Sequence, residues 1–467
     1  HKNARTILIQ MRLMDQYPDF KYAHTQPYTY ELLSQYYPEL FEELKEKVRS
    51  GQFEPVGAMY VEPDCNIPTA ESLIRQCLYG QLYYREAFGI TVDNAWLPDV
   101  FGNSWILPQI LKKSGVDYFV SNKMSTWNDT NRFPHNNFLW KGIDGTRICA
   151  CVPPTHFITW NMPSQIQENW DAYQDKETGG QTLSMFGYGD GGSGVTEEMV
   201  ELMHRFDKLS IMPKTEHMRA DEFLHRNLKD NDQLETWDGE LYLEMHRGTF
   251  TTKAVLKDFN RRLEAKLRAA ELLSVLRMKQ GKEYPAAELR DCYKKLLLNQ
   301  FHDILPGSAI HEVYEDSARE YAALSDGAAV LEQEAMNCLV REVDAAQNSV
   351  LVYNPSGTAG KFLCSAKLPD NCVLIQNGSM IPTQRAEDGS VIWEAELLPK
   401  GYQTFGCTTR LYQKVPCAEY WQQAEKSVFE NDFFRIELNA AGRFTRLYDK
   451  TVGREVLQKG LCGNRLV

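Results

Sequence analysis

Residues 95–120, AWLPDVFGNSWILPQILKKSGVDYFV, decide the fold of the first half of this chain. Ala95-Trp96-Leu97 is an apolar run that stops at a proline, as a buried strand does. Leu107 to Lys113 has the pattern of a helix closed by a serine and a glycine, and Tyr118-Phe119-Val120 is a second strand. This order of strand, helix and strand predicts a mostly parallel sheet wrapped by helices.

The same alternation extends towards the start of the chain. Tyr37 to Val48 and Ala70 to Phe88 have helical patterns, and Phe53 to Tyr60 lies between them as a short strand. We therefore expect residues 1–230 to form one α/β domain. In such sheets, the residues just past the strand ends are the usual place for chemistry.

Beyond residue 230 the pattern changes twice. Residues 231–345 carry apolar side chains at steps of three and four, which predicts a three-helix bundle. Residues 346–412 show short alternating runs between turn formers, which predict a small antiparallel β domain. Residues 413–467 begin a further β-sandwich domain that we expect to be incomplete, because both ends of the sequence fall inside a pattern. The expected fold class is therefore multidomain, α/β followed by α and then β.

Composition excludes several classes of protein. The 467 residues include 51 Lys or Arg and 63 Asp or Glu, so the formal net charge is −12. A nucleic-acid binder or a protein of anionic membrane surfaces would normally carry a basic stripe, so neither partner is expected. No apolar run has the length of a membrane span. The 11 cysteines follow no repeating frame, which favours buried thiols in the reducing cytoplasm.

The first candidate for chemistry is Asp99, in the segment Trp96 to Ser104. It directly follows a strand and precedes a glycine turn, which is where α/β active sites form. A carboxylate there can act as a nucleophile, a base or a metal ligand. The alternative is that Asp99 only caps a turn.

Two further segments combine glycine or histidine with a carboxylate. Gly187 to Gly194 is a glycine-rich loop whose one chemically useful group is Asp190, although a plain tight turn explains the glycines equally well. His302 and Asp303 lie at or beyond the end of an apolar helix, where the pair suits a metal site. The helix dipole alone also favours a histidine there.

A fourth segment, Asn122 to Asp129, follows the strand at 118–120. Lys123, Trp127 and Asn128 offer a cation, an aromatic face and an amide, a mixture that suits a sugar but is also common in loops without any ligand. His246 to Thr249 is assigned no chemistry beyond a pocket edge. Two generic hypotheses follow from the carboxylates and the His-Asp pair, namely metal-assisted hydrolysis and glycoside cleavage by a carboxylate pair.

Taken together, these segments resemble the α-mannosidases of glycoside hydrolase family 38, closest to the cytosolic and bacterial branch. The matching motifs run in order over most of residues 1–320, and a thinner likeness continues through Tyr448-Asp449-Lys450. The motifs are Val61 to Asn66, Trp96 to Ser104, Trp127-Asn128-Asp129, Phe133-Pro134-His135, Gly142 to Thr146, Gly187 to Gly194 and Leu298 to Ser308.

The resemblance implies a retaining exo-α-mannosidase that removes terminal mannose from oligosaccharides with a zinc ion in the sugar subsite. By match to the family motifs, Asp99 would be the nucleophile and a zinc ligand, and His302 a second zinc ligand. Asp190 is the candidate general acid/base. Lys123, Trp127, Asn128 and Asp303 would contact substrate. Cobalt is an alternative metal, since it occupies similar mixed nitrogen and oxygen sites.

The resemblance also makes residues 1–230 a catalytic domain with a barrel-like sheet that lacks its first strand. In the family that strand carries a His-x-Asp pair with two further zinc ligands, and it would lie just upstream of His1. No His-x-Asp near the start substitutes for it. We therefore expect this chain alone to bind zinc poorly and to be inactive, while the full-length enzyme is active.

Two other classes stay open on the sequence. One is a metal-dependent sugar deacetylase or amidohydrolase built on a similar barrel-like sheet. The other is a non-catalytic carbohydrate-binding protein, which the aromatic content of 11% and the β domains would suit. The oligomeric state is also open, because the β domains offer surfaces on which a homo-oligomer could form.

Overall fold

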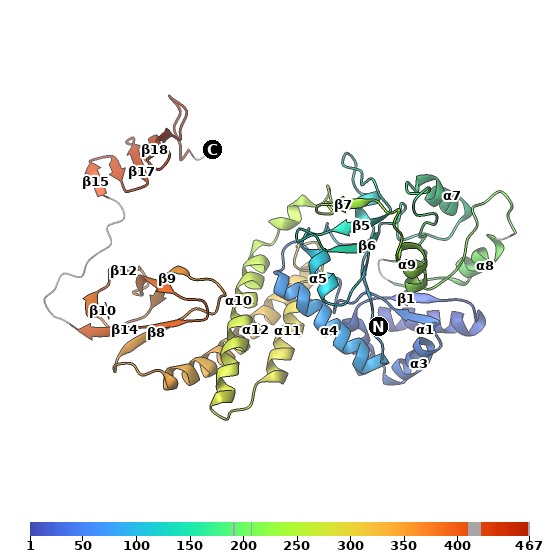
Figure 1. Ribbon diagram of the computed structural model, residues 1–467, viewed down its shortest axis with the longest axis horizontal. Helices are drawn as coiled ribbons and strands as arrows, with labels where there is room; N and C mark the ends of the chain where they lie inside the picture. Colours follow the sequence, from blue (N-terminus) through green and yellow to red (C-terminus); the bar gives the residue numbers. More distant parts are fainter. Residues whose placement is uncertain (190–191, 207, 410–421, 466–467) are drawn as a thin grey trace. The chain divides into compact units, whose positions relative to one another are not determined.

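The computed structural model describes residues 1–189, 192–206, 208–409 and 422–465, and the chain divides into two compact units, His1–Met336 and Asn337–Val467 (Figure 1). The first unit holds the α/β region and most of three long helices, and the second holds β sheets. The mixed, multidomain class expected from the sequence is confirmed at this level.

The first unit contains a two-stranded and a five-stranded sheet. The small sheet pairs β1 with β2 in parallel, and the large one has the order β3-β4-β6-β5-β7. Every pairing in the large sheet is parallel except that of β5 with β6. The strands are β1 Tyr22–His24, β2 Phe53–Pro55, β3 Asn94–Leu97, β4 Tyr118–Ser121, β5 Asn137–Lys141, β6 Arg147–Cys151 and β7 Thr236–Asp238.

Helices surround these sheets. Ala70–Phe88 forms a helix with the predicted bounds, because Thr69 accepts a hydrogen bond from Ser72 N–H at its start and Gly89 ends it with φ 72°. The helices of this region are α1 Lys2–Gln16, α2 Pro27–Tyr36, α3 Pro38–Arg49, α4 Ala70–Phe88, α5 Leu107–Lys113, α6 Lys123–Thr126, α7 Pro163–Ala172, α8 Glu197–Phe206 and α9 Ala220–Leu228.

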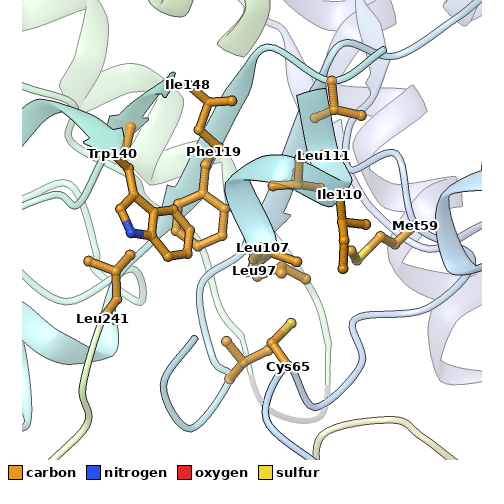
Figure 2. Packing of buried hydrophobic residues seen from close by; sticks show 14 of the residues in the cluster. Met59, Cys65, Leu97, Leu107, Ile110, Leu111, Phe119, Trp140, Ile148 and Leu241 are labelled. Carbon is orange, nitrogen blue, oxygen red and sulfur yellow. The ribbon is translucent and has the colours of Figure 1, made fainter. Parts of the chain in front are cut away.

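The hydrophobic core of this region lies directly behind the carboxyl ends of β3 and β4. Figure 2 shows side chains of α5, the sheet and the flanking loops meeting there, including Leu97, Leu107, Phe119, Trp140 and Leu241. Each of the five is at most 1% exposed. Burial of a side chain of this size contributes roughly 1.5 to 3 kcal/mol, so the core fixes the strand ends from which the site residues project.

Two local details differ from the sequence expectations. The strand expected over Phe53–Tyr60 ends at Pro55, because the chain turns at Gly57, with φ 77°, where an added β-carbon would lie 3.4 Å from the β-carbon of Trp96. The β5–β6 pair is an antiparallel hairpin inside an otherwise parallel sheet. Its turn is held by Asp144, whose carboxylate accepts the Thr146 backbone N–H at 3.0 Å and the Thr146 hydroxyl at 2.8 Å.

The three long helices are α10 Ala254–Lys279, α11 Ala286–Leu298 and α12 His311–Glu342, and a short 3-10 turn, Arg247–Phe250, precedes them. Their apolar stripes meet in one cluster that includes Leu263, Leu296 and Leu324. None of the helices in the described residues combines the length and the apolar character needed to cross a membrane.

The second unit contains three antiparallel sheets, in the orders β11-β10-β14-β8, β12-β13-β9 and β15-β16-β17-β18-β19. The first two share a buried core around Trp393 and Phe405. The strands are β8 Ser349–Tyr353, β9 Gly360–Ala366, β10 Cys372–Gln376, β11 Ser379–Met380, β12 Thr383–Arg385, β13 Val391–Leu397, β14 Tyr402–Thr409, β15 Gln422–Glu425, β16 Val428–Glu430, β17 Phe434–Leu438, β18 Phe444–Asp449 and β19 Arg454–Glu455.

Most of the described cysteines are free thiols, and five of the eight free ones are buried. Cys372 and Cys407 are the exception among the described cysteines, because a disulfide joins them across β10 and β14.

Candidate active site

Three side chains from two distant segments of the first unit converge near the carboxyl ends of β3 and β4. They are Asp99, His302 and Asp303. His302 Nε2 lies 3.4 Å from Asp99 Oδ2 and 4.0 Å from Asp303 Oδ2. One ligand atom of each residue falls within 4.8 Å of those of the other two. Two segments predicted separately, around residues 99 and 302, therefore form a single site.

Strand register brings a cation to the same place. β3 and β4 are parallel, with Leu97 opposite Ser121, so the residues that follow the two strands meet at one edge of the sheet. Asp99 follows β3 and Lys123 follows β4, and Lys123 Nζ lies 2.8 Å from Asp99 Oδ1. The lysine side chain is 8% exposed and that of Asp99 27%, so a buried ammonium pairs with a half-buried carboxylate.

The loop after α11 is attached to the segment at residue 62 by its backbone. The Glu62 carbonyl accepts both the His302 backbone N–H at 3.2 Å and His302 Nδ1 at 2.9 Å. With Nδ1 donating there, the neutral imidazole offers the Nε2 lone pair that a metal needs, whereas the protonated imidazole donates from Nε2 to Asp99.

Lys257 of α10 holds the far side of the same loop. Its Nζ donates to the carbonyls of Leu305 at 2.8 Å and Pro306 at 3.0 Å, and also to that of Thr252. This lysine therefore ties the His302 loop to the turn that precedes α10. The sequence analysis did not single it out, because the contact depends on the tertiary packing of α10.

Opposing effects set the ionisation of the site. Burial alone would raise the pKa of Asp99, but the hydrogen bonds from His302 and Lys123 and the Lys123 charge outweigh it, so the pKa is lowered. Burial disfavours the charged form of His302, yet the hydrogen bond to Asp99 and the carboxylates of Glu62 and Asp303 raise its pKa. The Asp99 carboxyl is thus held ionised in a half-buried position.

Glu62 adds a further carboxyl near this group. Burial raises its pKa, and the charge of His302 and a hydrogen bond from Thr25 oppose that effect. Thr25 Oγ1 donates to Glu62 Oε1 at 2.5 Å.

The converging side chains fit a divalent cation. One imidazole nitrogen and two carboxylate oxygens are donors that zinc accepts, and a histidine whose other nitrogen donates to a backbone carbonyl is typical of metal ligands. Among the described residues, Asp99, His302 and Asp303 are the one set of His, Cys, Asp or Glu side chains arranged in this way. Asp303 is held by Ser308, whose hydroxyl donates to its Oδ1 at 2.7 Å.

Aromatic rings form a wall beside the carboxylates. Lys123 Nζ lies 4.5 Å from the centroid of Phe101 and 5.7 Å from that of Trp127. The His246 ring lies edge-on to both, at 4.8 Å from Phe101 and 5.8 Å from Trp127. Gly102, with φ 91°, allows the chain after Phe101 to approach the backbone at Leu241 closely. His246, assigned only to a pocket edge from the sequence, is thus part of the wall.

Asn128, predicted to contact substrate, uses its amide inside the protein. Its Nδ2 donates to the carbonyls of Asn131 at 2.9 Å and Tyr242 at 3.0 Å, and its Oδ1 accepts Glu244 N–H at 2.7 Å. These bonds join the loop that carries Trp127 to residues 242–244.

Asp190 lies outside the described residues. The part of its loop that is described packs against α1, since Ser193 N–H donates to Thr6 Oγ1 at 2.9 Å and Gln10 Nε2 donates to the Ser193 carbonyl at 2.8 Å. A cavity of about 590 Å³ is lined by Gly189 of this loop and by Pro98, the residue before Asp99.

Comparison with known proteins identifies the family. Residues 1–240 match the glycosyl hydrolases family 38 N-terminal domain, and residues 244–339 match the alpha mannosidase middle domain. The chain belongs to glycoside hydrolase family 38. The resemblance seen in the sequence motifs is thereby confirmed.

Individual relatives agree with this membership. Alpha-mannosidase G of Dictyostelium discoideum is 32% identical over 504 residues, covering 100% of this chain and 46% of that protein. Human alpha-mannosidase 2C1 is 33% identical over 482 residues, covering 100% of this chain and 44% of that protein. The chain thus spans less than half the length of these relatives. A crystal structure of an alpha-mannosidase from Enterococcus faecalis V583 has the same fold, with a TM-score of 0.79 and 18% identity, covering 97% of this chain and 58% of that one.

Proposed function

We propose that the full-length protein is a retaining exo-α-mannosidase that hydrolyses terminal α-mannose from oligosaccharides. The observation that carries the proposal is the Asp99 carboxylate, which lies 2.8 Å from Lys123 Nζ and 3.4 Å from His302 Nε2 on an edge with exposed aromatic faces. Family membership supports the same reaction, and the relatives named above are alpha-mannosidases.

In the proposed mechanism, Asp99 attacks the anomeric carbon and forms a glycosyl ester as the bond to the leaving oxygen breaks. A nucleophile must be ionised, and the lowered pKa of Asp99 meets that need. A general acid must protonate the leaving oxygen and later deprotonate the water that cleaves the ester. We assign this role to Asp190 from the family motif. A retaining enzyme requires the two carboxyls to be about 5 to 5.5 Å apart, which an experimental structure can measure.

We propose zinc as the metal held by Asp99 and His302, with cobalt as the alternative. Asp303 is the third donor of the converging set and our candidate for contact with the sugar hydroxyls. When bound, such a cation would bind sugar hydroxyls and stabilise negative charge beside them. Because the described residues supply only part of a ligand set, we further propose that the remaining ligands come from outside this sequence.

Lys123 and Trp127 are our further candidates for substrate contact. Lys123 would hold Asp99 and a sugar hydroxyl together, and the Trp127 ring would offer a face to the apolar side of a sugar; the ion pair with Asp99 and the contact with Trp127 support this. Asn128 supports the loop that carries Trp127 through its three backbone contacts.

We also keep the barrel-like sheet as a proposal. β2 lies next to β3, because Ala58 N–H donates to the Asn94 carbonyl at 2.8 Å. Among the described strands, β1 pairs only with β2, and the 590 Å³ cavity lies between Tyr22 of β1 and residues 183–189. A strand from elsewhere in the full-length protein would fill this cavity and join the two sides. We keep the domain bounds 1–230, 231–345, 346–412 and 413–467 in the same proposal.

Turnover of p-nitrophenyl α-mannoside and zinc content by elemental analysis test the proposal. We expect the full-length protein to carry zinc and to release α-mannose first, as seen by NMR of the anomeric proton, and the 467-residue chain alone to do neither. Zinc at full occupancy and turnover by the 467-residue chain would overturn the proposal of missing ligands. Release of β-mannose would overturn the retaining mechanism.

Assays on the full-length protein also distinguish the other two classes, a sugar deacetylase and a carbohydrate-binding protein. Acetate released from an N-acetyl sugar, without mannose from a mannoside, would establish a deacetylase. Mannose binding that survives Asp99→Asn, without any turnover by the wild type, would establish a binding protein. A cytoplasmic location remains our proposal, since eight described cysteines are free thiols, and cell fractionation tests it. Sedimentation of the full-length protein would decide whether it forms a homo-oligomer.

A further inference from the structure

The exposure of the side chains around Asp99 increases in one direction. His302 is 3% exposed and Phe101 7%, whereas Trp127 is 38% exposed and His246 is also exposed. The side chains of His302 and Asp99, 4% and 27% exposed, therefore lie deeper than Trp127 and His246, whereas the Asp303 side chain is 41% exposed. Trp127 and His246 stand at the mouth of the site, where a group attached to the reacting sugar would lie.

The His246 ring takes no part in holding its own segment. Thr249 Oγ1 donates to the His246 carbonyl at 2.6 Å, Thr252 Oγ1 to the Gly248 carbonyl at 2.7 Å, and Arg247 Nε to the Glu244 carbonyl at 3.0 Å. These three neighbours use their side chains to fix the turn. Within the described ranges, by contrast, neither ring nitrogen of His246 has a hydrogen-bond partner.

The backbone at His246 is nevertheless specialised. Its φ of 66° is in the left-handed region, which few residues other than glycine adopt, although histidine, like asparagine and aspartate, does so more often than most. Such a conformation persists where the surroundings determine it. Here it sets the imidazole edge-on against Phe101 and Trp127.

We propose that His246 is a specificity-determining residue that hydrogen-bonds the leaving-group sugar, the unit next to the mannose held at Asp99. The Trp127 ring would support the apolar face of that sugar, and an imidazole nitrogen would meet one of its hydroxyls. This inference rests on the proposed mannosidase function and names the part of the substrate that the outer wall recognises. Burial and the Lys123 charge both lower the pKa of His246, so a neutral imidazole, able to donate and accept, is present at neutral pH.

Comparing two substrates distinguishes the proposed contact of His246 with the leaving-group sugar from an effect on the hydrolysis at Asp99. α-Mannobiose has a leaving-group sugar, whereas α-mannosyl fluoride has none and needs only the inner site. We expect His246→Phe in the full-length protein to lower kcat/KM for mannobiose by about 5- to 10-fold, the worth of one hydrogen bond. Turnover of the fluoride should stay within about 2-fold of wild type.

Two further variants make the result specific. His246→Asn keeps a polar group and tolerates the left-handed backbone, so it should recover part of the mannobiose activity. His225→Phe makes the same change on α9, where His225 Nε2 bonds Asp93 at the opposite end of β3, and should leave the ratio of the two substrates unchanged.

An equal effect of His246→Phe on both substrates, or no effect on either, would overturn the inference about His246. Fluoride turnover by the wild type would in that case still support the proposed function. If the wild type hydrolyses neither substrate, the proposed function fails, and this inference fails with it.

Discussion

The pKa values of two carboxyl groups of the first unit, half-buried Asp99 and buried Glu54, are shifted in opposite directions, and their surroundings explain why. Asp99 has an ammonium at 2.8 Å and an imidazole at 3.4 Å, and its pKa is lowered despite burial. Glu54 of β2 is 3% exposed and accepts the N–H groups of Ala220 at 2.7 Å and Asp221 at 2.9 Å. Burial raises the pKa of Glu54 to about 7.

The difference shows what separates a reactive carboxylate from a structural one. Backbone N–H groups at the start of α9 satisfy Glu54 without supplying a full positive charge, so desolvation prevails. At Asp99 two cationic or polar side chains prevail over desolvation. Glu54 therefore holds α9 on the sheet, whereas Asp99 is kept ionised and reachable.

The largest effect is expected at Asp99. Asp99→Asn removes the nucleophile and one of the converging metal donors, so kcat for an α-mannoside should fall by about 10³-fold or more. Steady-state kinetics of the full-length protein measures it. Asp93→Asn is the control, because Asp93 lies at the other end of β3, where its carboxylate bonds His225 Nε2 at 2.6 Å. Activity retained in the Asp99 variant would contradict its role as nucleophile.

His302→Ala should weaken metal binding more than it weakens folding. Loss of this nitrogen donor should lower zinc affinity by more than about 100-fold, since metal sites lose tenfold or more even when a supporting group is removed. Competition with a fluorescent chelator measures the affinity, and circular dichroism checks the fold. Unchanged affinity would show that the Asp99, His302 and Asp303 set is not the metal site.

Lys123→Met tests the ammonium group that offsets the effect of burial on the pKa of Asp99. Removing the ammonium leaves a half-buried carboxylate with one partner fewer, and we expect kcat/KM to fall by about 10²-fold while zinc content is unchanged. The acid limb of the pH profile should move to higher pH, because the Lys123 charge lowers the pKa of Asp99. Lys112→Met is the matched control, since Lys112 pairs with Asp117 before β4 in an exposed position.

Glu54→Gln should change stability, with activity nearly unaffected. The folded-state pKa of Glu54 is about 7, against its ordinary value of 4.5. The folded protein therefore binds a proton that the unfolded chain loses between those values, and this contribution to stability is complete below pH 4.5 and lost as pH rises through 7. Urea unfolding of wild type should lose roughly 1 to 3 kcal/mol across that window through this group.

In Glu54→Gln that pH-dependent loss should disappear. Glu216→Gln, in an exposed ion pair with Arg226 at 2.7 Å, should follow the wild-type curve. Identical pH slopes for wild type and Glu54→Gln would show that Glu54 does not govern the stability of the α9 junction.

Much of the inner site could be predicted from the sequence. Asp99 and His302 follow a strand and a helix with strong apolar patterns, and strand register then determines where such residues meet. The α4 helix was predictable to the residue, because Thr69 and Gly89 mark its ends locally. These features depend on nearby residues.

The features that could not be predicted depend on contacts between distant segments. Lys257 reaches carbonyls 48 and 49 residues away, and His246 meets rings at Phe101 and Trp127. The early end of β2 follows from packing of Gly57 on Trp96. No local pattern in a single sequence carries this information.

The hydrogen bond between His302 Nδ1 and the carbonyl of residue 62 has an evolutionary consequence. Because the acceptor is a main-chain atom, every amino acid at position 62 supplies it equally, and the tautomer of the imidazole is insulated from mutation there. The side chain at 62, a glutamate that accepts a hydrogen bond from Thr25, acts on the site separately, through its charge. Natural or engineered variants could therefore alter the electrostatic potential around the nucleophile at position 62 without misorienting the ligand at 302.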